Sequence, residues 1–254
     1  MTYKVIGVIP ARYGSTRLEG KPLKDICGKP MIQHVYERAS EAKTIEKVIV
    51  ATDDLRILEA VKAFGGEAVM TSVEHKTGTD RIAEVVRDID TEIVVNIQGD
   101  EPLIIPGIID EIVSELINDE SVNTATGCCV IKEQNMLTDP NVVKVVFDRQ
   151  GFALYFSRSL IPHPRKINQS DTYEHIGIYA YRKDYLMKYI TLEDTPLSLA
   201  ESLEQLKVLE HGDRIKVVST KYPYNALSVD TQDDLDKVRG LMKEYLNRKD
   251  NGEG

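Results

Sequence analysis

The sequence predicts an α/β fold: a mostly parallel, Rossmann-like sheet with helices on both faces, extended in the second half by antiparallel strands. In the first half, continuous apolar runs of strand length alternate with segments of helical periodicity. That alternation is typical of strands that are buried on both faces and connected by helices. In the second half, strand-like segments follow one another around turn residues, which indicates antiparallel pairing.

The first-half strands are runs rich in Val and Ile. We expect them at residues 5–10, 47–52, 67–70 and 92–97. The segments between them carry apolar residues at helical spacing, as Met31, Val35 and Ala39 do. Thr79 is expected to cap its helix, and glycines suit the end of the helix before residue 67. The expected helices span residues 30–42, 53–66, 79–89 and 106–119.

The second half combines strands with two helices. Residues 142–158 predict two strands joined by a turn at DRQG, and further strands are expected around Cys128 and at residues 175–182 and 214–220. A helix over 198–212 is indicated by Ser198 and Glu201 as a capping box with Gly212 as its stop, and a helix over 231–246 by Thr231 as its N-cap. We predict one α/β domain over residues 1–254, with 142–220 as an elaboration.

Composition narrows the function classes. The hydrophobic fraction of 42% and charged fraction of 29% are those of an ordinary soluble globular protein. The formal net charge of -9 argues against a nucleic-acid partner, because phosphate-backbone binding relies on Lys and Arg. The three cysteines have no metal-ligand spacing and suggest a reducing compartment. No apolar run approaches the ~20 residues of a spanning helix, and Met1 leads straight into a predicted strand, so we expect no membrane association and a cytoplasmic protein.

The stretch IPARYGSTRLEGKPL, residues 9–23, follows the first predicted strand. It fits neither of the two common phosphate motifs. Gly14 and Gly20 are too far apart for a P-loop, Lys21 is followed by Pro22 where a hydroxyl residue is needed, and the dinucleotide glycine fingerprint is absent.

The physical logic of phosphate binding still applies to this stretch. The carboxyl end of a strand in an open α/β sheet is where ligands bind, and small residues let backbone N–H groups approach an anion. Arg12, Arg17 and Lys21 bring three positive charges, which a highly charged anion such as a triphosphate would balance. The alternative is a solvated surface loop with ordinary charges.

Two carboxylates have the chemistry of a metal site. Asp100, in QGDEP, follows the strand at 92–97, where a carboxylate beside a triphosphate suits Mg²⁺. Asp230, in SVDTQDDL, precedes the last helix. The alternatives are an ordinary turn for QGDEP and, for Asp230, a charge that complements the helix N-terminus.

The segment TGTDR, residues 77–81, opens a predicted helix. Small residues at a helix N-terminus favour an anion or a polar ligand. The alternative is a plain helix cap with an exposed Arg81.

Together these motifs resemble the cytidylyltransferases that activate acidic sugars, and among them the branch that uses 3-deoxy-manno-octulosonate (KDO). The family pattern IPAR-x-x-S-x-R-L-P-G-K-P-L is matched except at Glu19, where the family usually has Pro. QGDEP, TGTDR and SVDTQDDL resemble the family segments in order, with Ser228 in place of the usual Gly. The resemblance runs from Val8 to Leu235.

The resemblance implies transfer of CMP from CTP to the anomeric hydroxyl of KDO, giving CMP-KDO and pyrophosphate for lipopolysaccharide precursors. It implies Mg²⁺ on Asp100 and Asp230, and a homodimer assembled largely through the second half, with 142–220 as a sugar-binding and dimerisation elaboration. The implied catalytic residues are Arg12, Lys21, Asp100 and Asp230. The implied nucleotide-binding residues are Pro10, Ala11, Arg12, Ser15, Arg17, Lys21, Gly78, Thr79 and Arg81.

For the sugar acid, the resemblance implies YFSR, HIGIYAYR and LEQLKVLEHG as the binding segments. Arg158 would meet the carboxylate, ideally in a bidentate pair. The full implied set is Gln98, Arg158, His175, Tyr179, Glu204 and Gln205. From the residues alone none of these stands out, since Tyr179 and His175 also suit a core and Glu204 a solvated helix.

Three other readings remain open at this point. The acceptor could be a related acidic sugar, an amino-substituted KDO (8-amino-KDO) or a sialic acid. The chain could be a non-catalytic nucleotide-binding homologue, although it keeps the charged residues named above. A dehydrogenase is disfavoured because the dinucleotide glycines are missing.

Overall fold

The computed structural model describes residues 3–14, 17–165, 171–224 and 227–250. The chain divides into two compact units. Unit 1 consists of Met1–Thr91, Asn96–Gly107 and Asn225–Gly254, and unit 2 of Glu92–Val95 and Ile108–Tyr224. Unit 2 begins well before residue 142, where we expected the elaboration to start. Whether the two units form a single domain stays a prediction.

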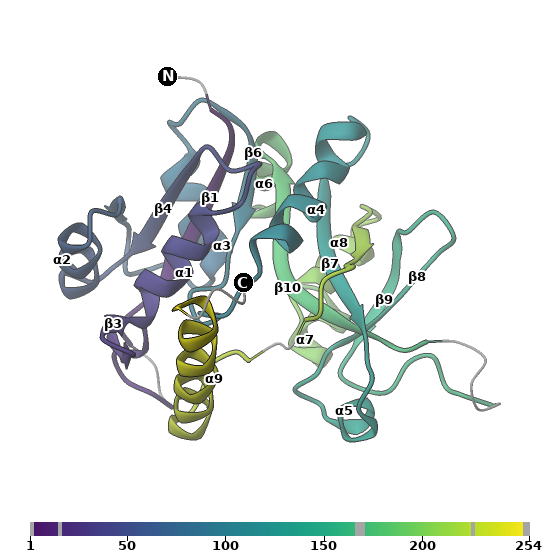
Figure 1. The fold of residues 1–254 in the computed structure, drawn as a ribbon. Coiled ribbons are helices and arrows are strands. Elements are labelled where there is room, and N and C mark those ends of the chain that lie inside the picture. Colours follow the sequence, from purple (N-terminus) through teal and green to yellow (C-terminus); the bar gives the residue numbers. More distant parts are fainter. Residues whose placement is uncertain (1–2, 15–16, 166–170, 225–226, 251–254) are drawn as a thin grey trace. The chain divides into compact units, whose positions relative to one another are not determined.

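The sheet of unit 1 is parallel. Strand β1 (Tyr3–Ala11) pairs with β4 (Lys47–Thr52), from Ile6 opposite Lys47 to Ala11 opposite Thr52. Strand β4 also pairs with β5 (Ala68–Met70). Helices α1 (Met31–Ser40), α2 (Leu55–Ala63) and α3 (Gly78–Val86) pack against these strands. The predicted α/β class is confirmed by this unit (Figure 1).

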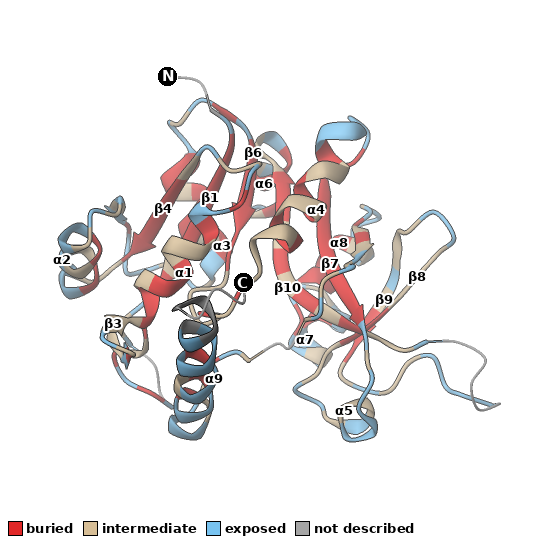
Figure 2. Ribbon diagram, in the orientation of Figure 1, coloured by how far each residue is buried: buried red, intermediate tan, exposed pale blue. Residues whose placement is uncertain are grey.

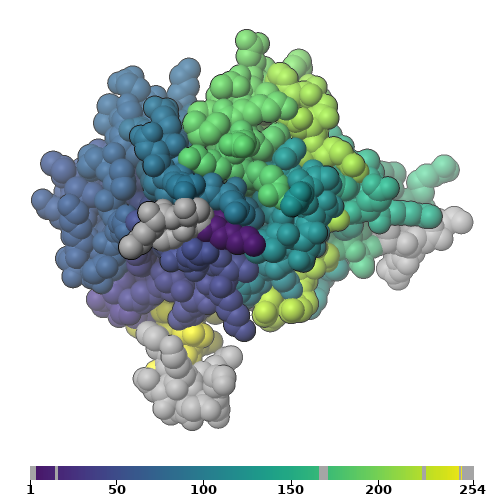
Figure 3. Space-filling model, turned by 90° about the horizontal axis from the view of Figure 1, so that it is seen from above, coloured from purple at the N-terminus to yellow at the C-terminus, as the bar shows by residue number. Residues whose placement is uncertain are grey.

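Burial explains why the apolar runs become strands. Val5, Ile6, Val8 and Ile9 of β1 are each at most 1% exposed, as expected for a strand covered on both faces. Strands β1 and β4 are accordingly coloured as buried along most of their length (Figure 2). The space-filling view shows only a small dark-purple area of β1, its amino-terminal end, at the surface (Figure 3).

The remaining elements of unit 1 lie around the loops that follow its strands. A single 3₁₀ turn, η1 (Lys21–Leu23), and a short hairpin of β2 (Asp25–Ile26) and β3 (Lys29–Pro30) lead into α1. The last helix, α9 (Gln232–Asp250), contacts β2. Two elements contain a boundary between the units: β6 (Thr91–Asn96) and α4 (Pro106–Asn118).

Unit 2 contains the antiparallel strands that we expected. Strand β10 (Tyr173–Arg182) pairs antiparallel with β7 (Thr124–Val130) and with β8 (Lys144–Phe147), and β8 pairs with β9 (Ala153–Ser157). Strand β11 (Lys216–Ser219) runs parallel to β7. The helical segments of unit 2 are α5 (Gln134–Thr138), α6 (Lys183–Tyr189), α7 (Pro196–Glu201) and α8 (Gln205–Glu210).

The predicted helix over 198–212 is wrong in one respect: it is two helices. Ser202 separates α7 from α8 in a left-handed conformation, with φ of 51°. Ser198 is not an N-cap, because α7 begins at Pro196 and the Ser198 hydroxyl accepts the Thr195 N–H at 2.9 Å. The predicted partner Glu201 is the last residue of α7 and accepts a hydrogen bond from Ser157 in β9 instead.

Within the described residues, no helix is long and apolar enough to cross a membrane.

Candidate active site

Three segments of unit 1 meet at the carboxyl end of β1. Pro10 and Ala11 end this strand. A Cβ on Gly78, at the start of α3, would lie 3.1 Å from Pro10 Cγ, and one on Gly99 would lie 2.8 Å from the Pro10 carbonyl oxygen. Gly99 therefore requires a residue without a side chain, and at Gly78 a side chain would fit only if Pro10 shifted by a few tenths of an ångström. The glycines bring the N-terminus of α3 and the QGDEP turn against the residues that begin the predicted phosphate loop.

The far side of that loop is anchored by Leu18. Its side chain is 8% exposed and lies in a hydrophobic cluster with residues of α9, among them Leu235 and Val238. Gly20, at φ of 64°, then turns the chain into η1 and so positions Lys21.

Lys21 joins the two predicted metal-binding carboxylates. Its Nζ lies 2.7 Å from Asp100 Oδ2 and 3.2 Å from Asp230 Oδ1. The two aspartates, 130 positions apart in the sequence, therefore lie within reach of one ammonium group. The backbone reinforces this arrangement, because the Val229 N–H donates to the Asp100 carbonyl oxygen at 2.9 Å.

The Asp230 side chain is not the cap of α9, and the alternative that its charge complements the N-terminus of that helix stays a prediction. Thr231 caps α9, as predicted: its hydroxyl oxygen accepts the Asp234 N–H at 3.2 Å. Asp234 completes the cap by accepting the Thr231 N–H at 3.0 Å. Since Asp234 supplies the capping carboxylate, the Asp230 side chain contacts Lys21 and Arg17 instead, with Arg17 at 3.1 Å.

Of the other predicted phosphate contacts, Arg12 is exposed and forms no ion pair with any described residue. Ser15 lies outside the described residues. Arg17 and Lys21 lie beside Asp100 and Asp230 in unit 1. The contacts of the predicted phosphate-binding residues with a nucleotide stay predictions.

Helix α3 begins at Gly78, one residue earlier than expected, and its N-cap lies two residues earlier. The predicted cap Thr79 is wrong: Thr77 is the N-cap, and its hydroxyl accepts the Asp80 N–H at 3.1 Å while Asp80 accepts the Thr77 N–H. Thr79 is instead buried inside the first turn. The capping box works at residue 77 because the acidic partner must follow three positions later.

Arg81 is 4% exposed, so the alternative of an exposed Arg81 is wrong. Its guanidinium donates to Asp53 at 2.6 Å and also to Thr71 and to the Ser72 carbonyl. These contacts join α3 to the ends of β4 and β5 and hold the N-terminus of α3 in place. Any contact between Arg81 and a nucleotide stays a prediction.

The predicted sugar residues, apart from Gln98 in unit 1, belong to unit 2. Arg158 is half-buried and donates to three backbone carbonyls, of Glu201 (2.8 Å), Pro140 (2.9 Å) and Ser202 (3.4 Å). It therefore holds the turn between α7 and α8. That turn carries Glu204, which accepts from the Tyr189 hydroxyl at 3.3 Å, and the buried Gln205.

His175 and Tyr179 lie side by side on β10, with ring centroids 5.4 Å apart. Burial lowers the pKa of His175 to about 3, so the ring is neutral at physiological pH, and its Nε2 lies 3.0 Å from the Thr126 hydroxyl. Burial also raises the pKa of Tyr179. The Tyr179 hydroxyl is buried without a hydrogen-bond partner among the described residues, which a polar ligand or water would supply.

The sequence reasoning missed Lys144. This lysine is fully buried, and its ammonium donates to the carbonyls of Asp139 (2.6 Å) and Arg158 (3.1 Å). It fixes the chain at Arg158. The available signal was a lysine in the otherwise apolar strand KVVF.

The described cysteines offer no nucleophile of ordinary reactivity on β7. Burial raises the pKa of both Cys128 and Cys129 to about 12, which keeps the thiols protonated.

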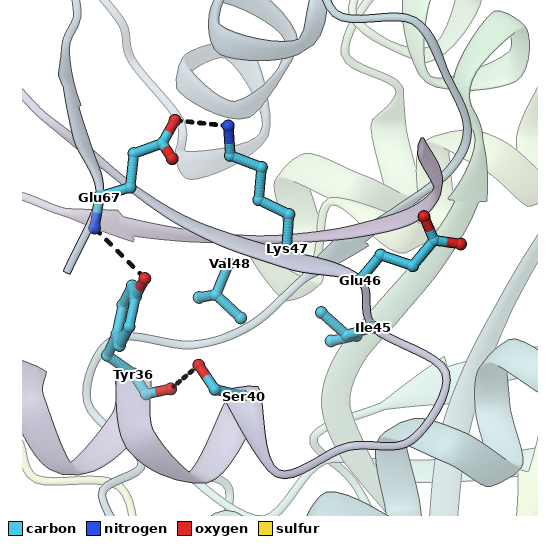
Figure 4. A pocket seen from close by; sticks show the side chains of 7 residues that line it. All are labelled: Tyr36, Ser40, Ile45, Glu46, Lys47, Val48 and Glu67. Carbon is cyan, nitrogen blue, oxygen red and sulfur yellow. Dashed lines mark hydrogen bonds and ion pairs between the residues drawn. The ribbon is translucent and has the colours of Figure 1, made fainter. Parts of the chain in front are cut away.

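A separate cavity of about 250 Å³ lies at the other end of the unit 1 sheet (Figure 4). It is lined by the end of α1, the start of β4 and Glu67, and Lys47 forms an ion pair with Glu67 across it at 2.7 Å. The parallel register places Lys47 opposite Ile6, while the site lies beyond Ala11 and Thr52. The cavity therefore shares no residue with the candidate site.

The two carboxylates fit a Mg²⁺ ion that takes its other ligands from a substrate and from water. Within the described part of the chain, no three His, Cys, Asp or Glu side chains gather as a metal cluster. Mg²⁺ is commonly held by only one or two carboxylates together with substrate phosphates and water. Asp100 and Asp230 supply such a pair of hard oxygen ligands beside two cationic side chains, Arg17 and Lys21.

This combination of an α/β fold with cations and paired carboxylates at the carboxyl end of a parallel strand is that of the nucleotidyltransferase class. The chain belongs to the cytidylyltransferase family, since the family profile described as Cytidylyltransferase matches residues 6–215.

Close relatives and a solved structure agree with this assignment. The chain is 52% identical to the 3-deoxy-manno-octulosonate cytidylyltransferase of Geobacter metallireducens, over 92% of this chain and 96% of the relative. It is also 52% identical to that of Geotalea uraniireducens, over 94% and 99%. A solved structure of CMP:2-keto-3-deoxy-manno-octonic acid synthetase complexed with CTP is 46% identical, covers 95% of this chain and 99% of that one, and has a TM-score of 0.89.

Proposed function

We propose that this chain transfers CMP from CTP to the anomeric hydroxyl of KDO, giving CMP-KDO and pyrophosphate. The observation that carries the proposal is the placement of Lys21 between Asp100 and Asp230, next to the loop after β1. The sugar assignment is supported by relatives that are about half identical over nearly their whole length. Neither an amino-substituted KDO nor a sialic acid is favoured by any observation.

The reaction depends on the alignment of the two substrates and requires no covalent enzyme intermediate. The anomeric oxygen forms a bond to the α-phosphorus, the bond from that phosphorus to the bridging oxygen breaks, pyrophosphate leaves, and the hydroxyl proton passes to solvent. Such a displacement depends on alignment and on neutralising the charge of the phosphates. The protonated thiols of Cys128 and Cys129 agree with direct displacement.

In this proposal Arg12, Arg17 and Lys21 bind the triphosphate and stabilise the charge on the departing pyrophosphate. Lys21 and Arg17 exchange their aspartate contacts for phosphate oxygens when the nucleotide enters. The N-terminus of α3, pressed against Pro10 through Gly78, offers backbone N–H groups to the nucleotide.

We propose that Asp100 and Asp230 hold Mg²⁺ together with phosphate oxygens. When bound, the ion would polarise the α-phosphate and assist ionisation of the attacking hydroxyl. The two aspartates then serve as its protein ligands, and the cations that contact them in this structure serve the phosphates.

We further propose that Gln98 of unit 1 and, in unit 2, Arg158, His175, Tyr179, Glu204 and Gln205 each contact the sugar acid. This proposal is supported by the unpartnered buried hydroxyl of Tyr179. A neutral His175 would accept or donate a hydrogen bond to a sugar hydroxyl without adding charge.

The proposal extends to the biosynthetic pathway, the cellular compartment and the oligomeric state. The product is an activated sugar that a glycosyltransferase in lipopolysaccharide precursor synthesis would consume, in the cytoplasm. A homodimer assembled through unit 2 is supported by large apolar side chains that are exposed there, including Leu154 (62%) and Leu199 (65%).

The preference for a nucleotide base tests the function directly. The chain is incubated with Mg²⁺, KDO and one of CTP, UTP, ATP or GTP, and pyrophosphate release is measured. We expect release with CTP well above that with the other three nucleotides. Preference for another base would overturn the proposal, as would CTP binding without turnover.

A further inference from the structure

Arg56 is the second residue of α2. One edge of its guanidinium group is held by Asp54, and one face of the group lies over Tyr13. Its Nε and one terminal nitrogen donate to the two carboxylate oxygens of Asp54, at 2.9 and 2.7 Å. Asp54 is itself fixed as the N-cap of α2, where it accepts the Arg56 N–H at 2.9 Å. One face of the guanidinium lies over the ring of Tyr13, with Cζ 3.2 Å from the ring centroid. This is the geometry of a cation–π stack oriented by a bidentate carboxylate.

Tyr13 closes the loop that delivers Lys21. Its carbonyl oxygen accepts the Gly20 N–H at 3.1 Å. Its ring lies against Gly20 so closely that a Cβ there would be 3.0 Å from the nearest ring atom. Gly20 is followed by Lys21, the residue that contacts both aspartates. A continuous set of contacts therefore leads from α2 through Arg56, Tyr13 and Gly20 to the catalytic lysine.

We propose that Arg56 is a positioning residue for CTP: stacked on Tyr13, it braces Gly20 and so fixes the position of Lys21. This inference rests on the proposed function, since it assigns the brace to the triphosphate of CTP. Arg56 acts through Tyr13 and contacts neither the substrate nor the reacting atoms.

The size of the effect follows from the contact. Loss of an exposed cation–π stack changes an equilibrium constant roughly two- to fivefold. Arg56→Ala should therefore raise KM for CTP roughly two- to fivefold. KM for the sugar and kcat should stay unchanged, because the loop binds the nucleotide.

The experiment is a double-mutant cycle between Arg56 and Tyr13. Arg56→Ala, Tyr13→Leu and the double variant are compared with the unaltered chain for KM of CTP, KM of KDO, kcat and the Kd for CTP measured calorimetrically. The two effects on CTP affinity should not add, because either change alone removes the stack. Tyr13→Phe, which keeps the ring, should resemble the unaltered chain.

The matched control is Lys62→Ala, which removes a positive charge from the last turn of α2. Equal CTP affinity in Arg56→Ala and Lys62→Ala would overturn the proposal. Additive effects of Arg56→Ala and Tyr13→Leu on CTP affinity would also overturn it. If the unaltered chain binds CTP but releases no pyrophosphate with KDO, the proposed function fails, and the calorimetric Kd values still decide the brace.

Discussion

Two carboxylates from distant parts of the sequence share the ammonium of Lys21. Side-chain chemistry alone predicts Asp100 and Asp230 as metal ligands, but it equally allows a turn for QGDEP and, for Asp230, a charge that complements a helix N-terminus. The structure brings both carboxylates to Lys21, and Asp234 supplies the capping carboxylate of α9. At the scale of single residues, Asp230 is available for Lys21 because Asp234 forms the hydrogen bonds of the helix cap.

Asp100→Asn tests the proposed metal site. The variant keeps the shape of the side chain but removes a charge and one hard oxygen ligand, so we expect Mg²⁺-dependent pyrophosphate release from CTP and KDO to fall roughly 100-fold. The Mg²⁺ concentration for half-maximal rate should rise. Asp233→Asn, on the exposed first turn of α9, is the control. Near-normal release by Asp100→Asn would remove the metal assignment.

At the scale of elements, the N-terminus of α3 positions part of the candidate active site. Gly78 can press against Pro10 only if α3 begins where it does, and that start depends on the Thr77 and Asp80 capping box. The buried ion pair of Arg81 with Asp53 holds the same end. In unit 2, the left-handed Ser202 plays a comparable part by ending α7 and redirecting the chain into α8.

Thr77→Ala tests the role of this cap. Loss of an N-cap hydroxyl costs about 1 kcal/mol, so we expect a lower free energy of unfolding together with a higher KM for CTP. Thr77→Ser keeps the hydroxyl and should behave like the unaltered chain. Denaturant unfolding and steady-state kinetics on the same samples provide the measurement. Unchanged CTP kinetics in a destabilised Thr77→Ala variant would show that the cap stabilises α3 without positioning the nucleotide site.

At the scale of the whole molecule, exposed apolar side chains in unit 2 bear on assembly. We expect the chain to elute and scatter light as a dimer, and Leu154→Glu with Leu199→Glu to shift it toward the monomer, because a charge at a buried interface is costly. Val73→Glu changes a side chain that is 70% exposed in unit 1, and should leave the dimer intact. A monomer for the unaltered chain would contradict the prediction.

Acid should destabilise the molecule partly through His175. Burial lowers its pKa from 6.5 to about 3, so between these values the unfolded chain binds a proton that the folded chain does not. The contribution to stability is therefore complete above pH 6.5 and is lost as the pH falls, by at most about 1.4 kcal/mol per pH unit.

The His175→Gln variant isolates this contribution. Its free energy of unfolding should decline less steeply from pH 6.5 to 4 than that of the unaltered chain, measured by urea denaturation at each pH. Glu174, whose pKa is raised by burial, acts in the opposite direction but is common to both proteins. His211→Gln, at an exposed position, should match the unaltered slope. Equal slopes for all three proteins would show that His175 protonates normally.

Periodicity determined most of the elements in unit 1. The strand over residues 47–52 has its predicted bounds, and β1 extends the predicted run by a few residues, because a strand buried on both faces needs an unbroken apolar stretch. Helix ends were less certain. Thr79 and Thr77 are equally good caps by composition, and the choice depends on Asp80 three residues after Thr77.

The sequence by itself determined the α/β class, the loop of small and cationic residues after the first strand, and the two aspartates, because each is a local pattern with a local physical cause. Only the tertiary structure decided which groups meet. Lys21 bridges Asp100 and Asp230, Arg158 holds three backbone carbonyls, and Arg56 stacks on Tyr13. These contacts join residues far apart in the chain, and no local pattern specifies them, because they depend on how packed strands and helices bring their ends together.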